Sequence, residues 1–286
     1  MITIGTRGSA LALAQVRIVA ERLGGDVEIR VLRTAGDASD RPIRELGDGV
    51  FVTAIEDALR SKEVDVAVHS LKDLPTAEPS DLVIAAIPER EDARDVLVTR
   101  ERSGLEGLPR GAVVGTSSPR RAAFLRALRP DSVARDIRGN VDTRLRKVHN
   151  GDYDAVIVAA AGLRRLGVAF DDATEALPLE LCPPAPGQGA LAIQIRAGDA
   201  ELAARLQTLE HRATRLAVTA ERALLRAMGA SCEIPLGAFG RMERDEIVLN
   251  AALATESGVR RALVRGVDPE EVARRAADAL GAAAHV

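Results

Sequence analysis

Short apolar runs alternate with amphipathic stretches through the first two-thirds of the chain. An apolar run at residues 2–6 precedes a helical pattern over residues 9–23, and a second apolar run follows at residues 27–32. The same order returns later, where helical patterns over residues 119–128 and 141–150 separate further apolar runs. Strands that alternate with helices indicate βαβ units in sheets of parallel type. The alternation therefore predicts an α/β fold for this part of the chain.

The last third of the chain has a different pattern. An amphipathic helix is predicted over residues 214–228, where apolar side chains recur on one side. Asp268 caps a closing helix that has Pro269 in its first turn. Between these helices, three strand-like segments follow one another directly, at residues 234–239, 247–253 and 259–267. This order of elements predicts a small α+β domain.

Two segments mark the points where the chain is expected to cross between domains. Residues 88–94 are highly charged, and residues 183–189 are rich in proline and glycine. The predicted fold class is α/β, with two doubly wound α/β domains and a small C-terminal α+β domain. Domain 1 is expected to be discontinuous, and the three domains comprise residues 1–88 with 190–208, residues 94–183, and residues 212–286.

The loop at residues 115–121 has the features of an anion site. Ser118 is a good helix N-cap and Pro119 suits the first turn, which places Arg120 and Arg121 at the positive end of the helix dipole. Without an anion this arrangement costs stability. With one, the backbone N–H groups, the loop hydroxyls and both guanidinium groups converge on the same ligand. The alternative at this point is that both arginines extend into water.

Further basic residues also follow predicted strands. Ligands of open α/β sheets bind outside the carboxyl ends of the strands, so the cleft between the two α/β domains is the expected site. Arginine suits a ligand with several carboxylates, because its guanidinium group binds a carboxylate through two hydrogen bonds. A phosphate ligand is less favoured, since the sequence has no P-loop and no G-x-G-x-x-G motif. The basic residues in question are Arg7, Lys72, Arg120, Arg121, Arg138, Arg144 and Arg165.

Two further side chains each have a functional and a structural interpretation. Asp73 follows a buried-type strand, and its carboxylate could stabilise a developing cation or move a proton; it could equally form the turn before a Leu-Pro pair. Cys232 lies in a loop and could be a nucleophile or a point of covalent attachment, although a lone cysteine is usually a small core residue. Cys182, in apolar surroundings, is expected to be that second kind.

Composition excludes several functions. The net charge is −3, aromatic residues make up 2% of the chain and tryptophan is absent, which argues against nucleic-acid binding. The four histidines have no metal-ligand spacing and the two cysteines form no disulfide framework, so no metal is expected. No signal peptide or membrane-spanning stretch is recognised, and a reducing cytoplasm is the expected location.

Seven short motifs follow one another along nearly the whole chain. They are residues 6–12 (TRGSALA), 68–75 (VHSLKDLP), 115–121 (GTSSPRR), 138–145 (RGNVDTRL), 161–166 (AGLRRL) and 186–190 (PGQGA), together with the loop of Cys232. In order and spacing they resemble the motifs of the porphobilinogen deaminase family, also called hydroxymethylbilane synthases. The resemblance implies a fold whose two α/β domains are similar to the lobes of periplasmic binding proteins.

The resemblance also implies a reaction. Family members are transferases of porphyrin and haem biosynthesis that join four porphobilinogen molecules head to tail, lose ammonia each time, and release linear hydroxymethylbilane with water. Each pyrrole carries an acetate and a propionate, so the growing tetrapyrrole chain is a polycarboxylate. A dipyrromethane cofactor, made from substrate, primes this growth, and by motif position Cys232 would hold it through a thioether.

Motif position further implies roles for individual residues. Asp73 would be the catalytic carboxylate, and the substrate-binding residues would be Arg7, Ser9, Arg144 and Arg165. Besides Cys232, the cofactor-binding residues would be Ser70, Lys72, Thr116, Ser117, Ser118, Arg120, Arg121, Arg138 and Gln188. We therefore expect Asp73→Asn to fold, keep its cofactor and lose nearly all turnover. We expect Arg121→Ala to fail at cofactor assembly or elongation and not at folding.

One segment departs from the family pattern, and two other functions remain as alternatives. Residues 44–51 read RELGDGVF where family members often have a Gly-Gly-Lys-Gly stretch, so no binding role is assigned there, and Arg44 is a candidate substitute. A two-lobed small-anion-binding protein without catalysis would have no use for Cys232. A phosphate-ligand transferase would need a nucleotide motif that the sequence lacks. We expect a monomer whose partner is the small molecule porphobilinogen.

Overall fold

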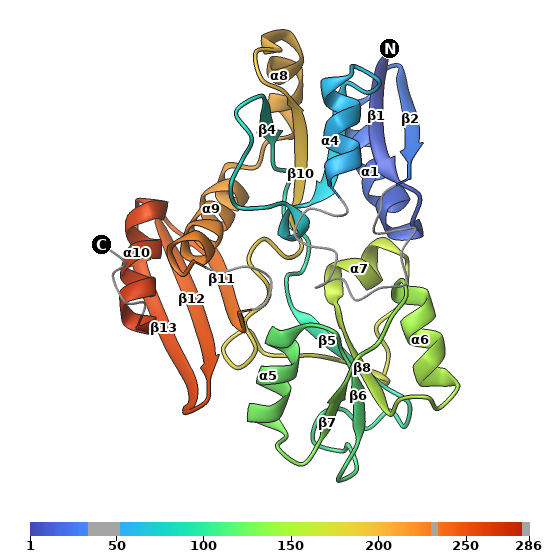
Figure 1. The fold of residues 1–286 in the computed structure, drawn as a ribbon, viewed down its shortest axis with the longest axis vertical. Helices are drawn as coiled ribbons and strands as arrows, with labels where there is room; N and C mark the ends of the chain where they lie inside the picture. Colours follow the sequence, from blue (N-terminus) through green and yellow to red (C-terminus); the bar gives the residue numbers. More distant parts are fainter. Residues whose placement is uncertain (34–51, 230–233, 282–286) are drawn as a thin grey trace. The chain divides into compact units, whose positions relative to one another are not determined.

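The computed structural model describes residues 1–33, 52–229 and 234–281 (Figure 1). Contacts between residues group the chain into two compact units. Unit 1 comprises Met1–Arg90 and Ala190–Arg215, and unit 2 comprises Glu91–Gly189 and Leu216–Val286. No helix in the described ranges is long and apolar enough to cross a membrane.

Unit 1 is built on one mixed five-stranded sheet. The strand order is β2-β1-β3-β10-β4, with β1 parallel to β2 and β3, and β10 antiparallel to β3 and β4. Ile4, Val16 and Val68 belong to the larger core of this unit, and Ile55 and Leu59 to a smaller one. The elements are β1 (Ile2–Arg7), α1 (Ala10–Leu23), β2 (Val27–Leu32), α4 (Thr53–Arg60), β3 (Val66–Ser70), η1 (Leu71–Asp73), β4 (Leu82–Ala86), β10 (Leu191–Arg196), α8 (Ala200–Leu206) and η2 (Gln207–Leu209).

The first sheet of unit 2 repeats this plan. Its order is β7-β6-β8-β5-β9, with β6 parallel to β7 and β8, and β5 antiparallel to β8 and β9. Phe124 packs in one of its cores with Val114 and Ile157, and Val158 belongs to another. The elements are β5 (Asp95–Thr99), β6 (Val113–Gly115), α5 (Pro119–Leu128), β7 (Val133–Arg135), α6 (Val141–His149), β8 (Ala155–Ala159), α7 (Ala160–Arg165) and β9 (Thr174–Ala176).

Unit 2 also contains the small C-terminal sheet. Strands β11 (Leu236–Glu243), β12 (Glu246–Thr255) and β13 (Gly258–Gly266) form an antiparallel meander. Leu224 of α9 (Arg212–Ala227) and Val272 of α10 (Pro269–Leu280) belong to the hydrophobic core of this sheet. Asp268 caps α10 by accepting a hydrogen bond from the Glu271 amide at 2.8 Å, as the sequence predicts.

The predicted fold class is confirmed: two doubly wound α/β sheets and a small α+β part are present. The expectation of sheets of parallel type is wrong, because β5 and β10 run antiparallel to their neighbours. Each of these strands begins within a few residues of a point where the chain passes from one unit to the other, so neither follows a helical crossover within its own sheet. The sequence reading also missed β5, β9 and α8. The division into three domains stays a prediction, and residues 44–51, where the sequence departs from the family pattern, lie outside the described ranges.

Candidate functional site

In unit 1, the predicted site residues lie where strands β1 and β3 end. The two strands are parallel, so the segments that follow them emerge at the same edge of the sheet. The short helix η1 places Asp73 here, and its side chain is exposed. A cavity of about 60 Å³ lies at this edge and is lined by Thr6, Arg7, Ser9, Leu11, Ala12, Gln15, Val52, Ile55, Val68, His69, Ser70 and Asp73.

Hydrogen bonds within unit 1 fix several polar groups that line this cavity. Ser9 caps α1 by accepting a hydrogen bond from the Ala12 amide at 3.3 Å. Gln15, which is only 5% exposed, donates from Nε2 to Ser70 Oγ at 2.9 Å. The hydroxyls are therefore held by the first turns of α1 and by the end of β3, whereas Asp73 remains accessible.

His69 is the third titratable group that lines this cavity, after Arg7 and Asp73. Its side chain is buried, and burial lowers the pKa of His69 to about 4, with a smaller opposing effect from the Gln194 side chain. In the described part of the chain, Nε2 of His69 makes no hydrogen bond. At neutral pH the imidazole of His69 is therefore uncharged, and the exposed side chain of Asp73 lines the same cavity.

In unit 2, the loop at residues 115–121 forms the start of α5 as the sequence predicts. Ser118 accepts a hydrogen bond from the Arg121 amide at 3.4 Å, and Pro119 occupies the first turn. The side chains of Arg120 and Arg121 are directed into the protein, with exposed fractions of 5% and 8%. The alternative that both arginines extend into water is therefore wrong.

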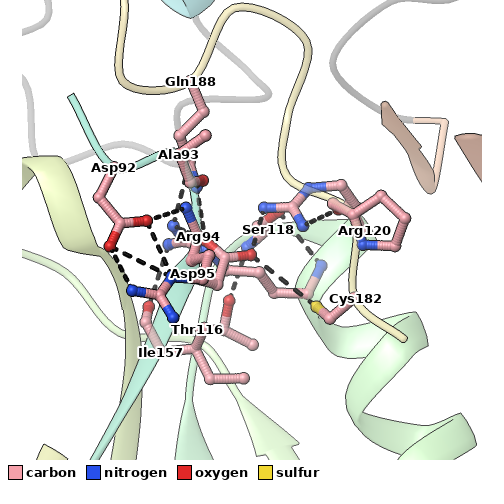
Figure 2. A network of polar contacts seen from close by, with 12 residues as sticks. Asp92, Ala93, Arg94, Asp95, Thr116, Ser118, Arg120, Ile157, Cys182 and Gln188 are labelled. Atoms are coloured by element: carbon pink, nitrogen blue, oxygen red, sulfur yellow. Dashed lines mark hydrogen bonds and ion pairs between the residues drawn. The ribbon is translucent and has the colours of Figure 1, made fainter. Parts of the chain in front are cut away.

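The carboxylate of Asp95 forms ion pairs with both arginines. Figure 2 shows Asp95 with Arg120 and Gln188 near it. Arg120 Nη2 is 2.7 Å from Asp95 Oδ2. Arg121 donates to Asp95 Oδ1 from Nη2 at 2.7 Å and from Nε at 3.0 Å. Asp95 is fully buried at the start of β5. The interpretation that the arginines need an external anion for stability is thus incorrect, because the protein supplies one internally.

The charges of this cluster do not cancel. Burial opposes ionisation of Asp95, but Arg120 and Arg121 more than offset this effect and hold the pKa of Asp95 far below its ordinary value. Two guanidinium groups face one carboxylate, which leaves one net positive charge among three buried side chains. In the described part of the chain, Arg120 Nε is buried without a hydrogen-bond partner.

Gln188 and Cys182 complete the surroundings of Asp95. Gln188 is fully buried and donates from Nε2 to Asp95 Oδ1 at 2.9 Å and to the Ala93 carbonyl at 2.8 Å. Cys182 Sγ lies 3.9 Å from Asp95 Oδ2. Burial, and then the charge of Asp95, raise the pKa of the Cys182 thiol to about 11. Cys182 is the buried, inert cysteine that the sequence predicts.

Two more predicted arginines extend the positive charge of this region. Burial lowers the pKa of Arg144 to about 10, and the like charges of Arg121 and Arg138 lower it further in the same direction. Arg144 donates from Nε to the Gly139 carbonyl at 2.8 Å, which holds it at the start of α6. Crowded cations of this kind favour binding of an anion.

The remaining predicted residues of unit 2 connect its loops. Ser117 Oγ donates to the Ile137 carbonyl at 2.8 Å and accepts from the Ile137 amide at 3.1 Å. Thr116 Oγ1 accepts from the Ser118 amide at 3.2 Å, and Arg165 donates to the Gly189 carbonyl at 2.6 Å. The loops after β6 and β7 are thereby held together.

The predicted site residues thus form two groups. Unit 1 brings together Arg7, Ser9, Ser70, Lys72 and Asp73, and unit 2 holds Thr116, Ser117, Ser118, Arg120, Arg121, Arg138, Arg144, Arg165 and Gln188. Cys232 and Arg44 lie outside the described residues. Sequence reasoning missed Asp95 and Gln15. The signal for Asp95 was an acidic residue directly before an apolar run, at residues 96–98. Within the described ranges, no group of three or more metal-ligating side chains is present.

Comparison with known proteins relates this arrangement to a family. Residues 2–204 match the family model "Porphobilinogen deaminase, dipyromethane cofactor binding domain", and residues 215–282 match "Porphobilinogen deaminase, C-terminal domain". The chain belongs to the porphobilinogen deaminase family. The first of these models is named for the dipyrromethane cofactor, so the expectation of that cofactor is confirmed.

Curated relatives extend the match over most of the chain. The porphobilinogen deaminase of Acidothermus cellulolyticus is 50% identical over 298 residues, covering 99% of this chain and 90% of its own. That of Roseiflexus castenholzii is 47% identical and covers 93% and 89%. Among solved structures, a periplasmic binding protein from Brucella ovis with glutathione bound is similar at a TM-score of 0.42 and 19% identity, over 81% of this chain and 70% of that one. Membership of the family confirms an enzyme of the transferase class that acts in tetrapyrrole biosynthesis.

Proposed function

We propose that this chain joins four porphobilinogen molecules head to tail, with loss of ammonia at each condensation, and releases linear hydroxymethylbilane by hydrolysis. The observation that carries the proposal is the match of both family models, which together span residues 2–204 and 215–282. A two-lobed anion-binding protein without catalysis is not favoured, because that function gives no reason for membership of an enzyme family.

The residues at the start of α5 fit a dipyrromethane cofactor. The cluster carries an excess positive charge and a buried donor, Arg120 Nε, without a partner among the described residues, and a ligand carboxylate would satisfy both. When bound, the cofactor provides the pyrrole carbon to which the first substrate is joined. In the proposal, Cys232 holds it covalently, and the residues that bind its acetate and propionate groups are Ser70, Lys72, Thr116, Ser117, Ser118, Arg120, Arg121, Arg138 and Gln188.

Asp73 is the proposed catalytic carboxylate. Its side chain is exposed at the edge of the unit 1 cavity, where a substrate can reach it. Loss of ammonia from porphobilinogen leaves a positively charged pyrrole, and a carboxylate close to the pyrrole N–H stabilises that charge and can accept a proton. The neutral side chain of His69 adds no competing positive charge at this cavity.

The substrate-binding residues in the proposal are Arg7, Ser9, Arg144 and Arg165. Arg7 and Ser9 line the cavity next to Asp73. Arg144 lies at the start of α6 near Arg121 and Arg138. Guanidinium groups at these positions pair with the acetate and propionate of an incoming pyrrole, which selects a dicarboxylate over a neutral pyrrole.

Intact mass tests the proposal directly. Freshly purified wild-type protein, incubated with porphobilinogen, should carry an added mass equal to two linked pyrrole units and should release ammonia and hydroxymethylbilane. Cys232→Ala should carry no adduct, whereas the matched control Cys182→Ala should carry the same adduct as wild type, because Cys182 is buried and its thiol pKa is raised. A wild-type protein that stays unmodified and forms no product would leave only the anion-binding alternative.

The proposal includes the expected state of the protein. We propose a cytoplasmic monomer with a small-molecule substrate and no nucleic-acid partner. Light scattering coupled to size-exclusion chromatography should give one chain per particle at every concentration. A larger particle that also dissociates on dilution would contradict the monomer without affecting the proposed reaction.

A further inference from the structure

We propose that Asp95 is a positioning residue of the reaction, whose buried carboxylate orients the guanidinium groups of Arg120 and Arg121 for the carboxylates of the bound pyrroles. The inference rests on the proposed function. Asp95 is separated from this ligand by the two arginines and acts through them, so it has no catalytic role of its own.

Each carboxylate oxygen of Asp95 pairs with a different arginine. Oδ2 is 2.7 Å from Nη2 of Arg120, while Oδ1 accepts from both Nε and Nη2 of Arg121 at 3.0 and 2.7 Å. A carboxylate shared in this way sets the two guanidinium groups relative to each other. Backbone carbonyls complete the hold, since Arg120 Nη1 donates to Pro183 at 2.8 Å and Arg121 Nη1 to Ile157 at 3.0 Å.

Asp95 is itself held in place. It lies at the first residue of β5, where it pairs with Ala159 of β8 in the sheet, and Gln188 donates to its Oδ1 at 2.9 Å. The Gln188 amide is in turn anchored on the Ala93 carbonyl (Figure 2). Arginines in the first turn of a helix are thereby tied to the rigid sheet and are oriented before a ligand arrives, which lowers the entropy lost on binding.

The charge of Asp95 has a second consequence. Without it, two buried guanidinium groups would repel each other and each would have lost its solvation. With it, one net positive charge remains in the cluster, and the buried Nε of Arg120 has no hydrogen-bond partner among the described residues. The net positive charge thus attracts one ligand carboxylate, but the fold does not depend on that carboxylate.

The test compares Asp95→Asn with wild type and with the control Asp92→Asn. Asp92 is an acid three residues before Asp95 in the sequence, is 10% exposed, and forms its ion pairs in the described ranges with Arg94 and Arg164, neither of which belongs to α5. Turnover is expressed per molecule that carries the covalent primer, which intact mass counts. Misfolded protein without primer is therefore left out of the calculated kcat. We expect Asp95→Asn to lower kcat per primed molecule about 10²-fold, the effect of misplaced reacting groups. KM should change less than about threefold, because Arg120 and Arg121 are proposed to bind the cofactor and the proposed substrate-binding residues are unchanged. Asp92→Asn should match wild type.

The possible results distinguish the positioning role of Asp95 from the proposed function. A wild-type kcat per primed molecule in Asp95→Asn, with only a lower melting temperature, would overturn the positioning role and leave Asp95 a structural residue. Absence of product in wild type would instead overturn the proposed function. If Asp95→Asn does not fold, Asp95→Glu replaces it, because it keeps the charge but displaces the carboxylate. That variant should fold and lose at least about tenfold in kcat per primed molecule, and wild-type kcat there would equally refute the role.

Discussion

The two regions that hold the proposed site residues treat their charges in opposite ways. In unit 1, Asp73 is exposed at the edge of a cavity of about 60 Å³, and the neighbouring His69 is kept neutral by burial. In unit 2, Asp95, Arg120 and Arg121 are buried, and their ion pairs are 2.7 Å long. The acid proposed for the chemistry contacts solvent, whereas two of the arginines proposed to bind the cofactor, Arg120 and Arg121, are part of the protein interior.

Because of this difference, substitutions in unit 1 should affect the reaction, and substitutions in the buried cluster of unit 2 should also affect the stability of the fold. An exposed carboxylate is held by few interactions, so its removal should change the reaction and leave the fold intact. A buried ion pair supports the fold and the site together, because removing one partner leaves a charge unpaired in the interior. Substitutions in the two regions should therefore differ in which quantity they change.

The largest effect is expected for Asp73→Asn. The amide cannot stabilise a developing positive charge or accept a proton, so turnover should fall about 10³-fold. The free energy of unfolding should change by less than about 0.5 kcal/mol, because the side chain is exposed. Steady-state product formation and urea unfolding measure the two quantities on one preparation. A variant with substantial turnover would remove the catalytic role of Asp73.

Arg121→Met should show the opposite behaviour and lower the free energy of unfolding by about 3 kcal/mol, because buried acceptors lose their donors. Methionine keeps the apolar stem, and Asp95 keeps Arg120 as its ion-pair partner, but Asp95 Oδ1 and the Ile157 carbonyl lose the guanidinium donors. Arg126→Met, at an exposed position of the same helix, is the matched control. Equal free energies of unfolding for Arg121→Met and Arg126→Met would contradict the claim that the buried charges of unit 2 support the fold. This prediction revises the expectation from sequence that Arg121→Ala fails at cofactor assembly or elongation and not at folding.

His69 should make the stability of the protein depend on pH by at most about 3 kcal/mol. Its pKa is about 4 in the folded protein and about 6.5 when unfolded, so the unfolded chain binds a proton that the folded protein excludes. The contribution of His69 to the free energy of unfolding should therefore fall as pH decreases from 6.5 to 4 and level off below. His69→Gln should remove this part of the slope, and the exposed His149→Gln should keep it. Identical slopes for wild type and His69→Gln would show that His69 is not buried as a neutral group.

The smallest effects come from two buried glutamines, one in each region. Gln188→Leu should destabilise the protein by about 2 kcal/mol, because Asp95 and the Ala93 carbonyl both lose a donor in the interior. Gln15→Leu should cost less than about 1 kcal/mol, since the Ser70 hydroxyl lines a cavity that water can enter. Thermal unfolding of the two variants gives the ranking, and the reverse order would contradict the difference between the regions.

Local sequence signals predicted the parts of this structure that local physics determines. The N-caps at Ser118 and Asp268 depend on residues within one turn, and both were predicted correctly. The direction of β5 and β10 was not predictable, because it follows from where the chain enters each sheet. Fold class depends on the order of elements along the chain and was therefore accessible from sequence.

The site divides in the same way. Motif order selected the arginines at the start of α5, but their partner Asp95 is 26 residues away from Arg121, and Gln188 is 93 residues away from Asp95. No local pattern links residues at such distances. The sequence therefore identified the two arginines and predicted an external anion for them. In the structure Asp95, at the start of β5, is the anion that pairs with both.

The measurement that tests the separation of the two regions most directly is the intact mass of Asp73→Asn over time with porphobilinogen, beside wild type. The account predicts that the variant is folded and carries the covalent primer on its cysteine, and that its mass does not increase further, while wild type passes through longer adducts and releases product. Growth and release at the wild-type rate would contradict it, as would a variant that is unfolded or carries no primer.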